Sequence, residues 1–164
     1  MHSKTGTLVQ AAVWVAIITL STLFFHIPLP MRNGYCNPGD GLILLSGLLT
    51  PGWAAAACGL GSALSDLLGG FALYAPATAL VKGAMGWLAG KLLSDENSSV
   101  RRLPVMLLIE GVMIAGYFVF ECLLYGPGAA LTSLPGNGCQ AAVGIALALA
   151  LRKPLQHYAK RMLK

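Results

Sequence analysis

The stretch SALSDLLGGFALYAPATALVKGAMG, residues 62–86, decides how this chain folds. Nearly every residue in it is apolar or small, yet it contains Asp66 and Lys82, one charge of each sign. The segment GGFALYAP (69–76) predicts a turn between two apolar helices, because Pro76 suits the first turn of the second helix. Isolated charges inside apolar helices are typical of proteins whose solvent is a lipid bilayer.

The composition of the whole chain points in the same direction. Of its 164 residues, 56% are hydrophobic and only 10% are charged, and the mean hydropathy is +0.70. A soluble domain would carry about 25% charged residues. The first apolar run, Leu8–Phe25, is long enough to cross a hydrocarbon core of about 30 Å as a helix and too long for the core of a signal peptide. We expect it to be retained as a membrane span.

Working outward from residues 62–86, the apolar runs predict six helices separated by segments rich in proline, glycine or charge. The predicted helices cover 7–27, 38–50, 53–70, 75–93, 103–125 and 137–153. Pro154 is expected to interrupt the last helix. The length leaves no room for a second domain. The sequence therefore predicts an all-α polytopic membrane protein, with six transmembrane helices in one compact bundle over residues 1–164.

The positive charges predict the orientation of this bundle. An even number of spans places both termini on one side, and nine of the eleven lysines and arginines then share that side. They are Lys4, Lys91, Arg101, Arg102, Arg152, Lys153, Lys160, Arg161 and Lys164. Because cytoplasmic loops carry an excess of Lys and Arg, we expect both termini in the cytoplasm and the loops 28–37 and 126–136 outside. A net charge of +5 distributed in this way does not indicate nucleic-acid binding.

Small residues recur at a spacing of four along several spans, which lets helix backbones approach closely in lipid. The default interpretation is packing within the bundle. On the first span, Ala12 and Ala16 share one face, and two interpretations stay open: the patch packs against another span, or it is the docking site of a partner helix. The other stripes are Ala55, Gly59 and Ala63, then Gly86 and Gly90, then Gly144 and Ala148.

Two interpretations also stay open for the charges of the opening stretch. Asp66 and Lys82 lie roughly 7 and 10 Å below the outer ends of two neighbouring antiparallel helices, at 1.5 Å per residue. Charges within a membrane usually pair, so Asp66 and Lys82 are expected to form a structural ion pair that locks these helices together. Alternatively, one or both face a substrate cavity.

The fifth predicted helix carries a second set of polar side chains. Glu110, Tyr117 and Glu121 fall on one helical face at spacings of seven and four, and Tyr125 follows one turn later. Carboxylates and phenols on one stripe suit a pocket for an aromatic ligand rich in hydrogen-bond donors. Glu110 lies deeper than the others, and we expect it to be a buried acid paired with Lys82 or Lys91.

Polar residues at two predicted helix starts have a local explanation. Asn37 can cap the second helix, and Asp40 then favours the positive end of the helix dipole. Asn137 and Gln140 resemble a capping box at the start of the last helix. Each of these four side chains can also form a hydrogen bond with a ligand from the outer rim.

Other kinds of site find little support. The histidines form no metal constellation, and neither a nucleophile–base motif nor a phosphate-binding loop is present, so we expect no metal, no cofactor and no enzymatic activity. The four cysteines form no CxxC pair and are expected to be free thiols. A disulfide between Cys36 and Cys139, which both lie near predicted outer loops, is the alternative.

Residues 34–90 carry a family resemblance. The sequence NGYCNPGDGLILLSGLLTPGWAAAACGLGSALSDLLGGFALYAPATALVKGAMGWLAG resembles the substrate-binding S components of energy-coupling factor (ECF) transporters. It is most similar to the riboflavin-type branch, which includes proteins assigned to pyridoxine, hydroxymethylpyrimidine and queuosine precursors. A GY…GD loop and a GSAL.DLLGGY..YAPAT...KG pattern are typical of that branch. The chain departs from the pattern at Phe71, where the branch has Tyr.

The resemblance implies a subunit that captures a vitamin-like molecule from outside for ATP-driven uptake. It implies partners: a membrane-embedded coupling subunit, which would dock on Ala12 and Ala16, and two cytoplasmic ATPases. It also implies the cytoplasmic membrane of a prokaryote as location. The residues expected to bind the ligand are Asn37, Asp40, Tyr74, Lys82, Tyr117, Glu121, Asn137 and Gln140.

The expected ligand is a small heteroaromatic micronutrient. The carboxylates favour amino or cationic donors, so a queuosine precursor, pyridoxine or a hydroxymethylpyrimidine ranks ahead of riboflavin. The alternative function is a small membrane scaffold or assembly factor without a transported ligand, for which carboxylates at this depth would have no use.

Overall fold

The computed structural model describes residues 4–25, 27–28, 35–49, 52–93 and 99–162. Within these ranges the chain forms six α-helices and one pair of two-residue strands. The helices are α1 (Lys4–Phe24), α2 (Gly39–Leu49), α3 (Ala54–Leu68), α4 (Ala75–Leu92), α5 (Ser99–Tyr125) and α6 (Pro127–Met162). The antiparallel strands β1 (Ile27–Pro28) and β2 (Tyr35–Cys36) join α1 to α2. The prediction of an all-α fold with six helices is confirmed.

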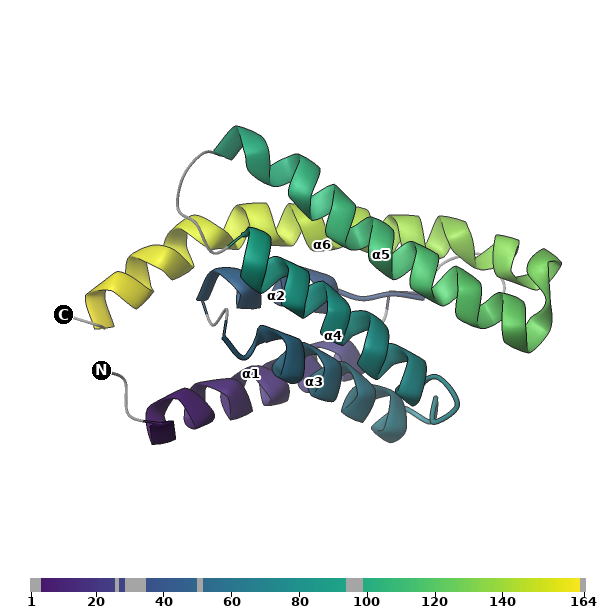
Figure 1. Cartoon of the computed structure of the whole chain (residues 1–164), viewed down its shortest axis with the longest axis horizontal. Helices are drawn as coiled ribbons and strands as arrows, with labels where there is room; N and C mark the ends of the chain where they lie inside the picture. The colour runs from purple at the N-terminus through teal and green to yellow at the C-terminus, as the bar shows by residue number, and fades with distance from the viewer. Residues whose placement is uncertain (1–3, 26, 29–34, 50–51, 94–98, 163–164) are drawn as a thin grey trace.

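The helices run roughly along one long axis of the molecule (Figure 1). The start of α1 and the end of α6 lie at the same end, at the left of the view, while the α3–α4 and α5–α6 turns lie at the opposite end. Each of these two turns contains a glycine with positive φ, Gly70 at 86° and Gly126 at 84°, a conformation that side chains with a Cβ rarely adopt. Glycine therefore ends α3 and α5 sharply and reverses the chain.

Three of the described helices are long and apolar enough to cross a membrane by length and composition, namely those containing Thr5–Phe24, Arg102–Tyr125 and Pro127–His157. By contrast, α2 has 11 residues and would reach only about 16 Å. It lies inside the bundle, in contact with α1, α3, α4 and α6. Ile43, Leu44 and Leu45 on it are fully buried, so α2 is a central core helix.

The outer surface of the bundle is apolar. On α1, the side chains of Val9, Val13 and Leu20 are each half exposed or more, and Leu80 on α4 and Leu123 on α5 are more exposed still. The interior meanwhile holds a group of buried polar and charged side chains. This distribution reverses that of a soluble protein and fits a chain surrounded by lipid.

Small residues hold α4 against its neighbours, as their spacing predicts. A Cβ added to Gly59 of α3 would lie 2.7 Å from the carbonyl oxygen of Ala79, and one added to Gly86 would lie 2.5 Å from that of Ala54. A Cβ on Gly47 of α2 would lie 2.3 Å from the carbonyl carbon of Ala89. Backbones at this distance leave no room for a methyl group, so glycine sets the spacing of these helices.

Three predictions about helix boundaries are wrong. The segment 126–136 is not a loop: α6 begins at Pro127, directly after the turn at Gly126, because proline needs no hydrogen-bonded N–H in a first turn. Pro154 does not end α6, which continues to Met162. Helix α5 begins at Ser99, a turn earlier than predicted.

Two predictions concern residues that are only partly described. The predicted outer loop 28–37 lies mostly outside the described residues. Three of the four cysteines are free thiols, as expected, namely Cys58, Cys122 and Cys139. The side chain of the fourth, Cys36, is outside the described part of the chain.

Candidate ligand-binding site

A buried ion pair joins α2 to α4 at the centre of the site. Lys82 Nζ contacts Asp40 Oδ1, and both side chains are almost fully buried. The sequence had suggested Asp66 on α3 as the partner of Lys82, whereas the contact that the structure shows is with Asp40 on α2. The face of α4 that packs on α3 carries Ala79 and Gly86, whereas Lys82 lies on a different face, toward α2.

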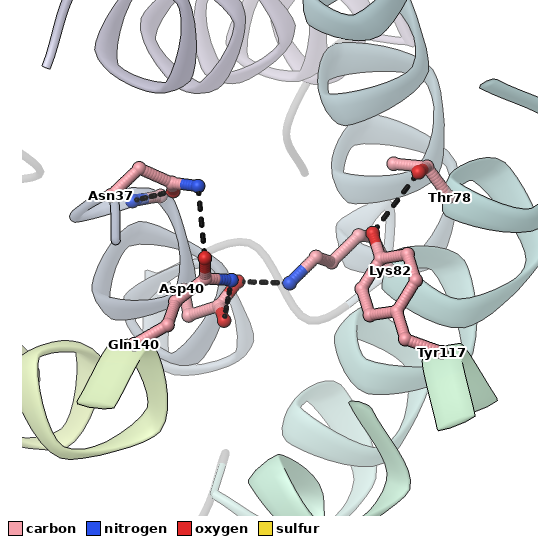
Figure 2. A network of polar contacts seen from close by, with 7 residues as sticks. Asn37, Asp40, Thr78, Lys82, Tyr117 and Gln140 are labelled. Atoms are coloured by element: carbon pink, nitrogen blue, oxygen red, sulfur yellow. Dashed lines mark hydrogen bonds and ion pairs between the residues drawn. The ribbon is translucent and has the colours of Figure 1, made fainter. Parts of the chain in front are cut away.

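Two amide side chains extend this pair toward α6 (Figure 2). Gln140 Nε2 donates to Asp40 Oδ2 at 2.7 Å, and Asn37 Nδ2 donates to Gln140 Oε1 at 3.1 Å. Asn37 Oδ1 in turn accepts a hydrogen bond from Gly39 N at 2.9 Å, which confirms that Asn37 caps α2. Asp40 is thus held by an ammonium on one side and an amide on the other.

A second contact lies on the opposite side of Lys82. The hydroxyls of Thr78 on α4 and Tyr117 on α5 are 3.0 Å apart, and Lys82 Nζ is 5.5 Å from the centre of the Tyr117 ring. Figure 2 shows Lys82 reaching from this side toward Asp40. The ammonium therefore combines an ion pair with a cation–π contact.

A separate polar cluster lies at the end of the bundle that holds the α3–α4 and α5–α6 turns. Tyr74, which precedes α4, donates to Glu121 Oε1 at 3.4 Å, and Ser133 of α6 donates to Glu121 Oε2. The Tyr74 and Phe120 rings meet edge to face, with centroids 5.3 Å apart. Burial raises the pKa of Tyr74, so its phenol keeps the proton that it donates.

These contacts form one polar seam between α4 and α5. Tyr74, Thr78 and Lys82 follow one another at spacings of four, so they share one side of α4 and of the turn before it. Glu121 and Tyr117, also four apart, lie opposite the first two. The seam runs from the turn end of the bundle to the buried Asp40.

Two buried polar groups at the site have no hydrogen-bond partner among the described residues. Both carboxylate oxygens of Glu110 on α5 are buried without one, as is Nδ2 of Asn137 on α6. The expected ion pairs of Glu110 are not formed, because Lys82 contacts Asp40, and the ammonium of Lys91 lies 4.1 Å from the Trp87 ring. Buried polar groups normally have partners, so these two groups are candidates for contact with a ligand.

The structure also corrects the interpretation of Asn137 and Gln140. They do not cap a helix, since α6 begins ten residues earlier, at Pro127. Instead Ser133, Asn137 and Gln140 fall on one face of α6 at spacings of four and three. Tyr125 is half exposed at the end of α5, beside Tyr74, with which it forms a side-chain hydrogen bond.

Two contacting residues escaped the sequence-based prediction. Ser133 lies in a segment whose prolines and glycines indicated a loop, which hid the helical spacing that it shares with Gln140. Thr78 could have been found, because it lies one turn before Lys82 on the same helix face. Among the described residues, no group of three or more His, Cys, Asp or Glu side chains could hold a metal ion.

The small-residue patch on α1 lies on the surface of the bundle. Ala12 and Ala16 are both exposed, and α1 packs mainly against α3 and less closely against α2. Buried positions of α1, such as Ala11 and Ile18, lie on a different face. Within the described chain, the patch therefore does not serve to pack α1 on another span.

Comparison with known proteins agrees with this architecture. The family model for the S component of ECF-type riboflavin transporters matches residues 2–157. An uncharacterized protein from Pyrococcus woesei is 35% identical over 129 residues, which cover 78% of this chain and 86% of that protein. The thiamine precursor transporter HmpT of Lactococcus lactis subsp. cremoris is 31% identical over 147 residues, covering 85% of this chain and 81% of HmpT.

The chain belongs to the family of S components of ECF-type riboflavin transporters. A substrate-binding subunit of a transporter for vitamin-like compounds fits both the match over nearly the whole chain and the buried polar site. The family is one of transporter components and not of enzymes.

Proposed function

We propose that this chain captures a small heteroaromatic micronutrient from outside the cell and hands it to an ATP-driven importer. The ligand would bind along the polar seam between α4 and α5, with its inner end at Asp40, Lys82 and Gln140. The outer end would lie at Tyr74, Tyr117 and Glu121. Asn37 would orient Gln140, and Asn137 would donate to the ligand.

One observation carries this proposal: a cluster of polar and charged groups buried inside an apolar bundle. Its members come from α2, α4, α5 and α6, and some of their hydrogen-bonding atoms have no described partner. Ligand pockets combine apolar walls with a few polar groups that fix orientation. A scaffold protein without a ligand would have no use for these groups, which are costly to bury in lipid.

The candidate ligands are a queuosine precursor, pyridoxine, a hydroxymethylpyrimidine and riboflavin. All offer flat rings and hydrogen-bonding edges. The name of the Lactococcus relative, a thiamine precursor transporter, favours a small ring compound over a large one. The carboxylates of Asp40 and Glu121 favour ligands with amino donors.

We further propose the orientation and the partners of the subunit. Both termini would lie in the cytoplasm of a prokaryote, because most positive charges lie toward the end of the bundle where α1 starts and α6 ends. The turns at Gly70 and Gly126 would face outward. A membrane-embedded coupling subunit would dock on the exposed Ala12 and Ala16, and two cytoplasmic ATPases would supply the energy.

Uptake by cells tests the proposal. Cells that lack their own uptake systems would carry this chain with an ECF coupling subunit and its two ATPases, and would receive each radiolabelled candidate ligand. Accumulation of one candidate that requires both this chain and active ATPases supports the proposal. A scaffold would give no accumulation of any candidate above cells without the chain.

A further inference from the structure

The charged groups buried at the inner end of the site balance one another. Asp40 and Lys82, which are 1% and 5% exposed, form an ion pair, and Gln140 donates to the second oxygen of Asp40 at 2.7 Å. A buried ion pair is tolerated at low dielectric constant when each charge is matched and hydrogen-bonded in this way. The pair therefore leaves no charge over for a ligand to neutralise.

A second carboxyl group lies beside this pair. Glu110 of α5 is 1% exposed, and a Cβ added to Gly144 of α6 would lie 3.0 Å from Glu110 Oε1 and 2.9 Å from Asp40 Cβ. Two buried carboxyl groups that lie side by side and share one ammonium do not both ionise. Since Lys82 holds Asp40, the proton lies on Glu110. The inner cluster, made of Asp40, Lys82 and Glu110, thus sums to zero charge.

The other charged side chains of the interior lie away from the inner cluster. Glu121 is at the outer end of the seam, and Asp66 is on α3, which packs mainly on α1 and α4. Two buried arginines, Arg102 on α5 and Arg152 on α6, lie roughly 12 Å along their helices from the cluster, at 1.5 Å per residue. None of them changes the balance at the inner end.

A group in the seam that lacks a partner is also uncharged. Nδ2 of Asn137 is buried without a hydrogen-bond partner among the described residues. Asn137 lies on the same face of α6 as Ser133 and Gln140, between the outer and the inner polar groups. An amide N–H is satisfied by a neutral acceptor, such as a carbonyl oxygen or a ring nitrogen. Recognition at this depth therefore calls for a hydrogen bond and not for a charge.

Resting on the proposed function, we propose that the site selects an uncharged heteroaromatic ligand and discriminates against cations and anions built on the same ring. An ionic group at the inner end would meet a cluster of zero net charge and would stay uncompensated at low dielectric constant. Asn137 donates to a ring nitrogen or a carbonyl oxygen of this ligand. Alcohol, nitrile and carbonyl substituents are thus accepted, while alkylamines, carboxylates and phosphate esters are rejected.

Calorimetric titration of the full chain in detergent at neutral pH tests this with probes that share a ring and differ in charge. One series is the uncharged 7-cyano-7-deazaguanine with the 7-aminomethyl cation and the 7-carboxy anion. In the other series 4-amino-5-hydroxymethyl-2-methylpyrimidine, pyridoxine and riboflavin are each compared with their phosphate esters. Three variants set the charge of the inner cluster. Lys82→Met makes it negative, the Asp40→Asn, Glu110→Gln double variant makes it positive, and Glu110→Gln alone keeps it neutral.

The wild type is expected to bind at least one uncharged probe about tenfold or more tightly than its charged analogues, because a buried charge without a partner is costly. Glu110→Gln should keep this order. Lys82→Met should shift the preference toward the cation and the double variant toward the anions, whereas a preference that depends on size alone would not follow the charge of the cluster.

A charged probe that binds the wild type as tightly as its uncharged analogue, or more tightly, would overturn the inference. This comparison decides even if the variants do not fold. Uptake of a charged compound by the assembled transporter would overturn the inference and leave the proposed function standing, whereas no binding of any probe would overturn both.

Discussion

Lys82 on α4 and Asp40 on α2 form a buried ion pair between residues that are 42 positions apart in the chain. This pair places a short interior helix, α2, against the α4 helix that carries the polar seam. It also turns one carboxylate oxygen of Asp40 toward Gln140 of α6. Three helices therefore meet at one carboxylate, and the inner end of the proposed site is built on it.

The first prediction concerns the partner of Lys82. A double-mutant cycle with Lys82→Met and Asp40→Asn should give a coupling energy of about 1 kcal/mol or more, since either single change leaves a buried group without its partner. Stability is measured by unfolding in mixed micelles of increasing SDS content. The matched cycle with Asp66→Asn should give a coupling near zero. A larger coupling to Asp66 than to Asp40 would contradict the structure.

The second prediction concerns the outer cluster. Glu121→Gln should weaken ligand binding without unfolding the protein, because it removes the charge that accepts from Tyr74 and Ser133 but keeps the shape of the side chain. The expected loss is about tenfold, as for a hydrogen bond to a charged group. Binding is measured by calorimetry, and unchanged affinity would remove Glu121 from the site. Cys122→Ser, at the next position, is the control for a change in the same turn.

The helices could be predicted from the sequence because their signals are local. Apolar runs, the glycine turn at Gly70 and small residues such as Gly59 and Gly86 each act within a few residues or on one helix face. The start of α6 could not be predicted in this way. Pro135 and the glycines around it indicate a loop by composition, and only the turn at Gly126 and packing against α5 make the segment helical.

The site was predicted less completely than the fold. Spacing along one helix correctly grouped Tyr117 with Glu121. The partner of Lys82 could not be found in this way, because Asp40 and Asp66 are both carboxylates on neighbouring helices. Choosing between them requires the rotation of α4 about its axis, which tertiary packing alone determines.

The third prediction tests the close packing of α4. Gly86→Ala should destabilise the protein by about 1–3 kcal/mol, because the new methyl group would lie 2.5 Å from the carbonyl oxygen of Ala54. Gly111→Ala is the matched control in α5, where a Cβ would meet no atom within 4 Å. The control should be neutral or slightly stabilising, since alanine favours the helix. Equal effects of the two changes in SDS unfolding would argue against glycine-mediated packing.

The fourth prediction concerns the patch on α1. Ala12→Leu with Ala16→Leu should abolish uptake by the assembled transporter while the isolated subunit keeps its ligand affinity. Both alanines are exposed, so larger side chains there would obstruct a partner helix without disturbing the interior. Leucine replacements at the exposed Ala56 of α3 serve as the control. Loss of binding together with uptake, or survival of both, would show that this face does not couple the subunit to the transporter.

The central claim is that the buried cluster around Asp40 binds a small molecule. Mass spectrometry of compounds extracted from the purified protein tests it most directly, with the wild type compared with an Asp40→Asn, Gln140→Ala double variant that is shown to be folded by circular dichroism. We predict that the wild type releases one heteroaromatic compound in near-stoichiometric amount and that the folded double variant releases none. The same compound recovered equally from both proteins would contradict the account.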